Sequence, residues 1–489
     1  MSQRRGTRLL AIGLDAAEPA LIRSLIEQGE LPALKSLLAE GRWMSVRSPA
    51  YIGSGAVWPT FATGQDPLAH GVHGEWSWQP QAMAVIRYDG SDLRPFWKTL
   101  SEQGVSVGVL DPPFIRTVGI DDGFEITEWG PHDALDDRCH AGPAAIADFL
   151  AKSKPHPFSL NRHDNASADD PEELENLISS CIKGATLRGR LAETLITRTR
   201  PDFALIVFPE IHHGAHYLWH ELDSRDGEHA TTSLSEICRE VDRQLAVLIK
   251  TAGRDAAVMV FSLHGMRPTA GVPVFLAALL MEKGFATASG WTDQTWSDRA
   301  HSLIAVVKRH SPASLKRLYY KTLPPRTTRY LAQPTMLPAY DWTRTRAFSL
   351  PSDQHGWIRL NLRGRESAGI VMPEEYESCC LQLEEMLRGL RTEAGAPLVQ
   401  NVIRTATNSE EAGSSNLPDL VVHWAEAAFE TSSRINGSAT KIETISRKFT
   451  GQHAPEGFCI LRTKSNLNGK SELPAKEMHL LISGILADE

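Results

Sequence analysis

The chain has 489 residues, of which 42% are hydrophobic and 22% are charged, and its formal net charge is −8. This length is ample for a large buried core, and the acidic balance favours neither nucleic acid nor an anionic membrane as a partner. No apolar stretch reaches the roughly 18 residues that a membrane-spanning helix needs. The six cysteines include no Cys-x-x-Cys pair, which fits a reducing compartment. We therefore expect a cytoplasmic protein, and its oligomeric state stays open.

Short apolar runs alternate with amphipathic stretches along the first half of the chain. The apolar runs predict buried strands at residues 9–14, 105–110, 203–208 and 256–261. The amphipathic stretches predict two helices that end near Gly29 and Gly41, and further helices at residues 96–103, 172–197 and 234–248. This order predicts an α/β fold with a doubly wound, mostly parallel sheet that is flanked by helices.

Two stretches depart from this alternation and are interpreted as insertions. Residues 112–170 are irregular and then acidic. Residues 270–345 become basic, proline-rich and aromatic after one predicted helix, which suggests a cap-like insertion. The core is then expected to comprise residues 1–269 and 346–489. Its second part contains predicted strands at residues 357–362, 420–424 and 458–461, and predicted helices after Pro373 and at residues 475–486.

Basic and aromatic side chains of the expected cap could attract an anionic substrate. The basic ones are Lys316, Arg317, Lys321, Arg326 and Arg329, and Tyr319, Tyr320 and Tyr330 could stack on a base or sugar. A solvated basic surface explains the same residues equally well. The substrate-binding residues therefore stay unassigned.

Side chains that could bind a metal follow two of the predicted strands. Asp15 ends the first strand, where a carboxylate is either a metal ligand or a helix cap. Glu210, His212 and His216 follow the strand at residues 203–208. The two histidines lie four residues apart and would share one face of a helix, a spacing that suits zinc, and Glu210 could be a further ligand or a base. The alternative is a polar helix start with solvated histidines.

Three further candidates lie next to glycines. Ser54 stands between two glycines, which would let the backbone turn sharply and present the hydroxyl. His264 follows the strand at residues 256–261, and His453 precedes the last predicted strand. Each is also compatible with an ordinary turn. Because the carboxyl ends of parallel strands meet at one edge of a sheet, these groups are candidates for one active site.

The order of these motifs resembles the type I phosphodiesterase/nucleotide pyrophosphatase-like family of the alkaline-phosphatase superfamily. The resemblance spans about residues 8–487, apart from the two insertions. It is carried by Ile12-Gly-Leu-Asp15, by the stretch from Trp58 to Gly71, by Ser-Leu-His-Gly at residues 262–265 and by Gly-Gln-His-Ala-Pro-Glu-Gly at residues 451–457. It implies a nucleophile nine residues before Thr63, which is Ser54.

The resemblance also implies two metal ions, usually zinc, with manganese or iron as alternatives. The first site would comprise His212, His216 and His453, and the second would comprise Asp15, Ser54 and His264. Two positions depart from the family pattern, because His212 and Leu263 each stand where the family has an aspartate. Leucine cannot bind a metal, so the second site loses a carboxylate that Glu210 or Glu18 could replace.

The implied activity is metal-dependent hydrolysis of a small anionic phosphate mono- or diester through a phosphoseryl intermediate on Ser54. Hydrolysis of a phosphonate, phosphoramidate or sulfate ester, and phosphoryl transfer, are alternatives on the same scaffold. A catalytically weak binding protein is the alternative of a different class, and Leu263 is its main support.

Overall fold

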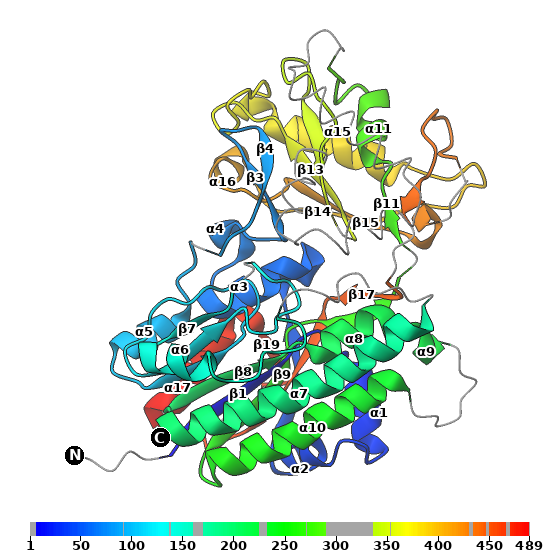
Figure 1. Cartoon of the computed structure of the whole chain (residues 1–489). Helices are drawn as coiled ribbons and strands as arrows, with labels where there is room; N and C mark the ends of the chain where they lie inside the picture. The colour runs from blue at the N-terminus through cyan, green and yellow to red at the C-terminus, as the bar shows by residue number, and fades with distance from the viewer. Residues whose placement is uncertain are drawn as a thin grey trace. The chain divides into compact units, whose positions relative to one another are not determined.

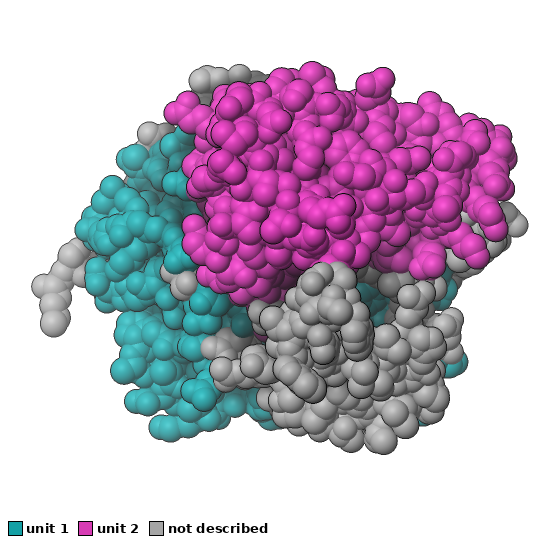
Figure 2. All heavy atoms as spheres, turned by 90° about the horizontal axis from the view of Figure 1, so that it is seen from above, with its two compact units in different colours: residues 1–66, 89–269, 448–489 teal, residues 67–88, 270–447 magenta. Residues whose placement is uncertain are grey.

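The chain forms two compact units in a computed structural model. Unit 1 contains residues 1–66, 89–269 and 448–489, and unit 2 contains residues 67–88 and 270–447 (Figure 2). The structure describes residues 6–90, 92–135, 138–159, 170–223, 232–269, 271–289, 336–352, 354–429, 434–445, 449–465 and 470–488. The basic and aromatic residues at positions 316–330, which were considered for substrate binding, lie outside these ranges.

A nine-stranded, mostly parallel sheet forms the centre of unit 1, which confirms the predicted α/β fold. Its strand order is β19-β2-β18-β9-β1-β8-β5-β6-β7. β1 (Leu9–Leu14) lies between β8 (Phe203–Phe208) and β9 (Ala257–Ser262) and is parallel to both. The other strands are β2 (Arg42–Arg47), β5 (Val107–Leu110), β6 (Gly123–Thr127), β7 (His140–Gly142), β18 (Glu456–Arg462) and β19 (Glu472–Pro474).

Helices cover both faces of this sheet, and this explains why its central strands are apolar along their whole length (Figure 1). Leu10, Ile12 and Leu14 of β1 point into one core. That core includes side chains of α1 (Pro19–Glu27), α2 (Pro32–Glu40), α7 (Pro171–Thr199), α8 (Glu210–Leu218) and α10 (Ser233–Ala252). On the other face, α3 (Val57–Thr63) and α5 (Phe96–Glu102) place Phe61 and Phe96 against strand phenylalanines.

The shorter elements of unit 1 connect these layers. They are η1 (Pro49–Tyr51), η2 (Ser54–Ala56), α6 (Ala144–Leu150), α9 (His220–Asp223), β10 (Gly265–Pro268), β17 (Gly451–Ala454), η6 (Ala475–Glu477) and α17 (Met478–Asp488). In the described ranges, no helix combines the length and the apolar character needed to span a membrane.

Residues 112–170 differ from the expected insertion, because β6 and β7 extend the main sheet. β6 runs parallel to β5, and β7 is antiparallel to β6. The strand was missed because β6 buries a glutamate in place of an apolar residue. The carboxylate of Glu125 accepts hydrogen bonds from the backbone N–H groups of Val118 and Gly119, which stabilises it in the interior.

Unit 2 contains a separate four-stranded antiparallel sheet with the order β12-β13-β15-β14. The strands are β12 (Ala347–Leu350), β13 (Gly356–Leu360), β14 (Val399–Arg404) and β15 (Leu420–Trp424). The strands β13 and β15 were expected in the same core as β1, but they pair within this sheet. The apolar pattern identified both strands, but it does not specify which strands pair with them.

The remaining described elements of unit 2 are short, except for one helix. They are α4 (Pro67–His70), β3 (Trp76–Gln79), β4 (Ala84–Arg87), β11 (Val272–Pro273), α11 (Leu276–Glu282), η4 (Pro373–Glu375), α15 (Tyr376–Arg388), α16 (Ser409–Gly413), η5 (Glu426–Phe429) and β16 (Thr444–Ile445). Asp419, at the start of β15, is buried and accepts two hydrogen bonds from Arg365, at 2.7 and 2.8 Å. Arg365 in turn binds Glu366. Buried charges of both signs are thus paired within this unit.

Candidate metal centre

Four histidines from separate segments meet at the carboxyl ends of β8 and β9. The helix α8 begins directly after β8 and carries His212 and His216 one turn apart. His264 follows β9, and β17 pairs with β10 so that His453 lies opposite Met266. All four imidazoles are buried, with only 2–6% of each residue exposed. This burial excludes the alternative of solvated histidines.

His212 is at the centre of this cluster. Its Nε2 lies 2.8 Å from Nε2 of His453 and 3.0 Å from Nε2 of His216. The ring of His264 lies parallel to that of His453, with 5.0 Å between the centroids. The structure therefore brings together the four histidines that the sequence suggested, although the resemblance divided them between two sites.

An oxygen atom fixes the orientation of two of these rings. Nδ1 of His212 donates to Oδ2 of Asp15 at 2.7 Å, and Nδ1 of His216 donates to the carbonyl oxygen of Gly451 at 3.0 Å. An ionised carboxylate and a carbonyl can only accept, so each Nδ1 carries the proton. In the neutral rings, both Nε2 atoms are then unprotonated.

The residues present fit a metal ion. Unprotonated Nε2 atoms of His212 and His216 that lie 3.0 Å apart repel each other unless a proton or a cation lies between them. Burial, together with the neighbouring imidazoles, lowers the pKa of His212 and of His453 well below the usual value, which disfavours the proton. An imidazole whose other nitrogen is held by a carboxylate or carbonyl is the usual form of a metal-binding histidine.

His132 belongs to the same cluster and was missed in the sequence. Its ring stacks on that of His212 at 3.8 Å, and its Nδ1 lies 3.0 Å from Oδ1 of Asp133. The ligand nitrogens of His132, His212 and His216 lie within 4.8 Å of one another, so these three residues could hold a metal ion. A His-Asp pair after a strand was the available signal, but the strand β6 that precedes it was itself not predicted.

Asp15 follows β1 as predicted, and both of its oxygens have partners. Oδ2 accepts from His212, and Oδ1 accepts from Nε1 of Trp58 at 2.8 Å. The indole ring of Trp58 passes close to the backbone of Gly13, where an added Cβ would lie 2.7 Å from the ring. Glycine at this position therefore lets the tryptophan approach the end of β1.

Ser54 is the first residue of η2, which leads into α3. It is half-buried, and the hydrogen bonds of the histidine cluster do not include it. Its segment is linked to the cluster through Trp58, one helical turn further along. Neither Gly53 nor Gly55 has a left-handed backbone, so the expected sharp glycine turn is not what presents this hydroxyl.

Glu210 is directed away from the histidine cluster and into a buried ionic network. Its Oε1 accepts from Nε of Arg188 and lies hydrogen-bonded to Nε2 of His156, both at 2.9 Å. Arg188 also donates to Oδ2 of Asp111 at 2.7 Å and to the carbonyl oxygen of Gly130 at 2.9 Å. The network connects the start of α8 with the segment that carries His132.

Leu263 is buried directly after β9, and the two carboxylates suggested as replacements are engaged elsewhere. Glu210 binds Arg188. Glu18 accepts from the backbone N–H groups of Ala20 and Met266, at 3.3 and 3.0 Å, and thereby caps α1. In the described part of the chain, neither glutamate contacts the histidine cluster.

Replacing Arg188 with methionine is expected to lower the free energy of unfolding by about 3–5 kcal/mol, because Asp111 and Glu210 would keep buried charges without their partner. Urea unfolding followed by tryptophan fluorescence measures this change. Arg190→Met is the matched control, since Arg190 is exposed on the same helix. Equal stability of the two variants would contradict a role for the network.

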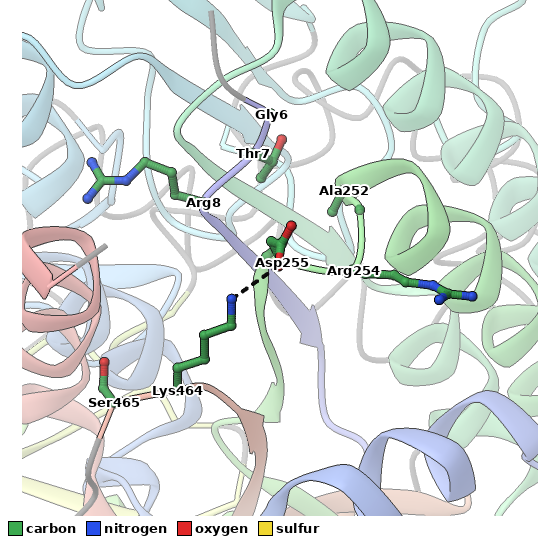
Figure 3. Close-up of a pocket in the computed structure, with 10 residues that line it drawn as sticks. Gly6, Thr7, Arg8, Ala252, Arg254, Asp255, Lys464 and Ser465 are labelled. Atoms are coloured by element: carbon green, nitrogen blue, oxygen red, sulfur yellow. Dashed lines mark hydrogen bonds and ion pairs between the residues drawn. The ribbon is translucent and has the colours of Figure 1, made fainter.

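A surface pocket of 840 Å³ lies at the opposite edge of the main sheet, near the amino ends of β1 and β9. Figure 3 shows Lys464 directed at Asp255, with Nζ 3.1 Å from the carboxylate, and Arg8 and Arg254 pointing to opposite sides. The described lining contains no histidine. The candidate metal centre therefore lies at the other end of the strands.

The fold and the buried histidines define an α/β protein with a candidate metal centre at the strand ends. The chain belongs to the type I phosphodiesterase/nucleotide pyrophosphatase family, whose model matches residues 9–453. No curated protein matches the chain.

Solved structures of similar fold were found at low sequence identity. Phosphonoacetate hydrolase from Sinorhizobium meliloti 1021 is 14% identical over 99% of this chain and 96% of that chain, with TM-scores of 0.56 for its complex with phosphonoformate and 0.55 for its complex with phosphonoacetate. Murine ectonucleotide pyrophosphatase/phosphodiesterase 5 is 10% identical over 98% and 95% of the two chains, with a TM-score of 0.46.

Proposed function

We propose that this chain is a metal-dependent hydrolase of small anionic phosphate mono- or diesters, with Ser54 as its nucleophile. The observation that carries the proposal is the meeting of the Nε2 atoms of His212, His216 and His453, two of which have an oxygen on their Nδ1 side. Zinc is the metal that this ligand set favours, and manganese or iron are alternatives. Membership of a family of phosphodiesterases and nucleotide pyrophosphatases supports the reaction class.

A bound metal ion would stabilise negative charge on the phosphoryl oxygens and lower the pKa of a nearby hydroxyl. Oγ of Ser54 attacks phosphorus, a bond forms between them, and the bond from phosphorus to the leaving alcohol breaks. The serine proton leaves with that alcohol. Water then attacks the phosphoseryl group, which restores the serine and releases phosphate, or a phosphate monoester when the substrate is a diester.

A phosphonate is the second candidate substrate, because phosphonoacetate hydrolase shares the fold. At 14% identity this likeness supports the scaffold and does not choose the substrate. The two substrate classes differ in the bond that breaks, which is P–O in an ester and P–C in a phosphonate. A direct comparison of both classes is therefore part of the test.

Metal removal and reconstitution test the proposal. The protein is stripped with a chelator, reloaded with zinc, manganese or iron, and assayed with p-nitrophenyl phosphate, bis-p-nitrophenyl phosphate and phosphonoacetate. We expect turnover of at least one ester, its loss in the stripped protein, and its return with metal. Turnover of phosphonoacetate alone would replace the ester by a phosphonate. No turnover in any metal-loaded form would favour a binding protein built on the same fold.

A further inference from the structure

We propose that this chain holds one metal ion where the family resemblance implies two, and that Asp15 is a positioning residue for His212 and not a metal ligand. This inference rests on the metal-dependent function proposed above. It concerns how many ions the site takes and which residues touch them.

The position of Asp15 is the first step. Its Oδ2 accepts from Nδ1 of His212, whereas the meeting point with His216 and His453 lies at Nε2, across the imidazole ring. An ion bound at Nε2 is therefore beyond the reach of Asp15. The carboxylate instead fixes the tautomer and the orientation of the ring, which is the usual task of an oxygen behind a metal-binding histidine.

The surroundings of Asp15 are the second step, since it could bind only a separate ion. Its other oxygen accepts from Nε1 of Trp58 at 2.8 Å, and only 3% of the residue is exposed. A second dication there would have to share this carboxylate with two N–H donors. The next strand end offers Leu263, an apolar residue that is 1% exposed. Burying a dication with so little negative charge is unfavourable.

Charge balance is the third step, and it joins the two departures from the family pattern. Histidine at position 212 and leucine at position 263 each replace an aspartate, so the centre loses two negative charges. The absence of one divalent cation removes two positive charges and restores the balance. His212 also supplies the N–H donor that Asp15 binds in this structure. One change in metal number thus explains both substitutions.

Metal stoichiometry and affinity in the full-length protein test this inference. Zinc is measured by elemental mass spectrometry after equilibrium dialysis, and its affinity by competition with a chromogenic chelator. We expect one zinc ion per chain in the wild-type protein, in Asp15→Asn and in Asp15→Leu. The leucine variant should bind zinc about 10- to 100-fold more weakly, because it loses the acceptor for His212. The asparagine variant should lie between it and the wild type, because an amide oxygen still accepts from Nδ1.

Trp58→Phe is the matched control, because it removes the other hydrogen bond of Asp15 and leaves the one to His212. Its zinc affinity should fall less than that of Asp15→Leu, and thermal unfolding checks that each variant is folded. Two ions in the wild type and one in both Asp15 variants would overturn the inference while leaving the proposed function intact. No bound zinc in the wild type would overturn both. One ion without hydrolysis would keep the inference and refute the function.

Discussion

Replacing Ser54 with alanine is expected to lower kcat by at least about a thousandfold, because removal of a nucleophile eliminates the covalent route. Zinc content should stay at the wild-type value, since the clustered imidazoles and not the serine hold the ion. Steady-state kinetics with the best ester and elemental analysis of the same sample measure the two quantities. Loss of activity together with loss of metal would indicate a structural effect instead.

A second serine close in sequence provides the control for this experiment. Ser48 precedes η1, is buried, and its Oγ has no hydrogen-bond partner within the described structure. Ser48→Ala should therefore keep wild-type kcat. Acid quenching of the wild-type protein during turnover should trap a phosphoryl group on the peptide that contains Ser54. Full activity of Ser54→Ala would remove this residue from the mechanism.

The central part of the fold was predictable because burial on both faces leaves a direct trace in the sequence. The apolar runs at residues 9–14 and 203–208 coincide with β1 and β8, and the ligand-like residues that follow them meet at one edge of the sheet. The pairing of β13 and β15 in a separate sheet was not predictable, because an apolar run indicates a strand without indicating its neighbours.

The candidate site was predictable where strand ends were recognised, and less so elsewhere. His132 was missed because the strand before it contains a buried glutamate that interrupts the apolar pattern. Glu210 was considered as a ligand because it lies two residues from His212. Its partner Arg188 is on a different helix, and only the three-dimensional structure reveals that the two charges neutralise each other.

The geometry also changes the meaning of the carboxylate at the end of β1. From the sequence, Asp15 had two interpretations, a metal ligand and a helix cap. The structure shows neither contact, because Asp15 accepts from a histidine and a tryptophan, while Glu18 caps α1. A side chain that is fixed on both oxygens can hold His212 in a single orientation. Preorganisation of this kind lowers the cost of ordering the ligands when an ion binds.

Replacing His216 with alanine is expected to weaken zinc binding by more than about a hundredfold, beyond the loss that follows removal of an outer hydrogen bond. His216 contributes one of the Nε2 atoms beside His212, and the remaining imidazoles cannot move to replace it, because Gly451 and Asp15 anchor their segments. Ester hydrolysis should fall with the bound metal and should recover in part at high zinc concentration. Chelator competition and zinc-dependent kinetics measure both effects.

His220 offers a control of the same residue type, one turn beyond His216 along the chain and exposed at the start of α9. His220→Ala should bind zinc and turn over substrate as the wild type does. If His216→Ala and His220→Ala bound zinc equally well, the ion would have to be held elsewhere. The repulsion between the unprotonated Nε2 atoms of His212 and His216 would then need a proton shared between the two rings. An outcome of that kind would show up as a histidine that stays charged in the metal-free protein, which NMR titration of the imidazole resonances detects.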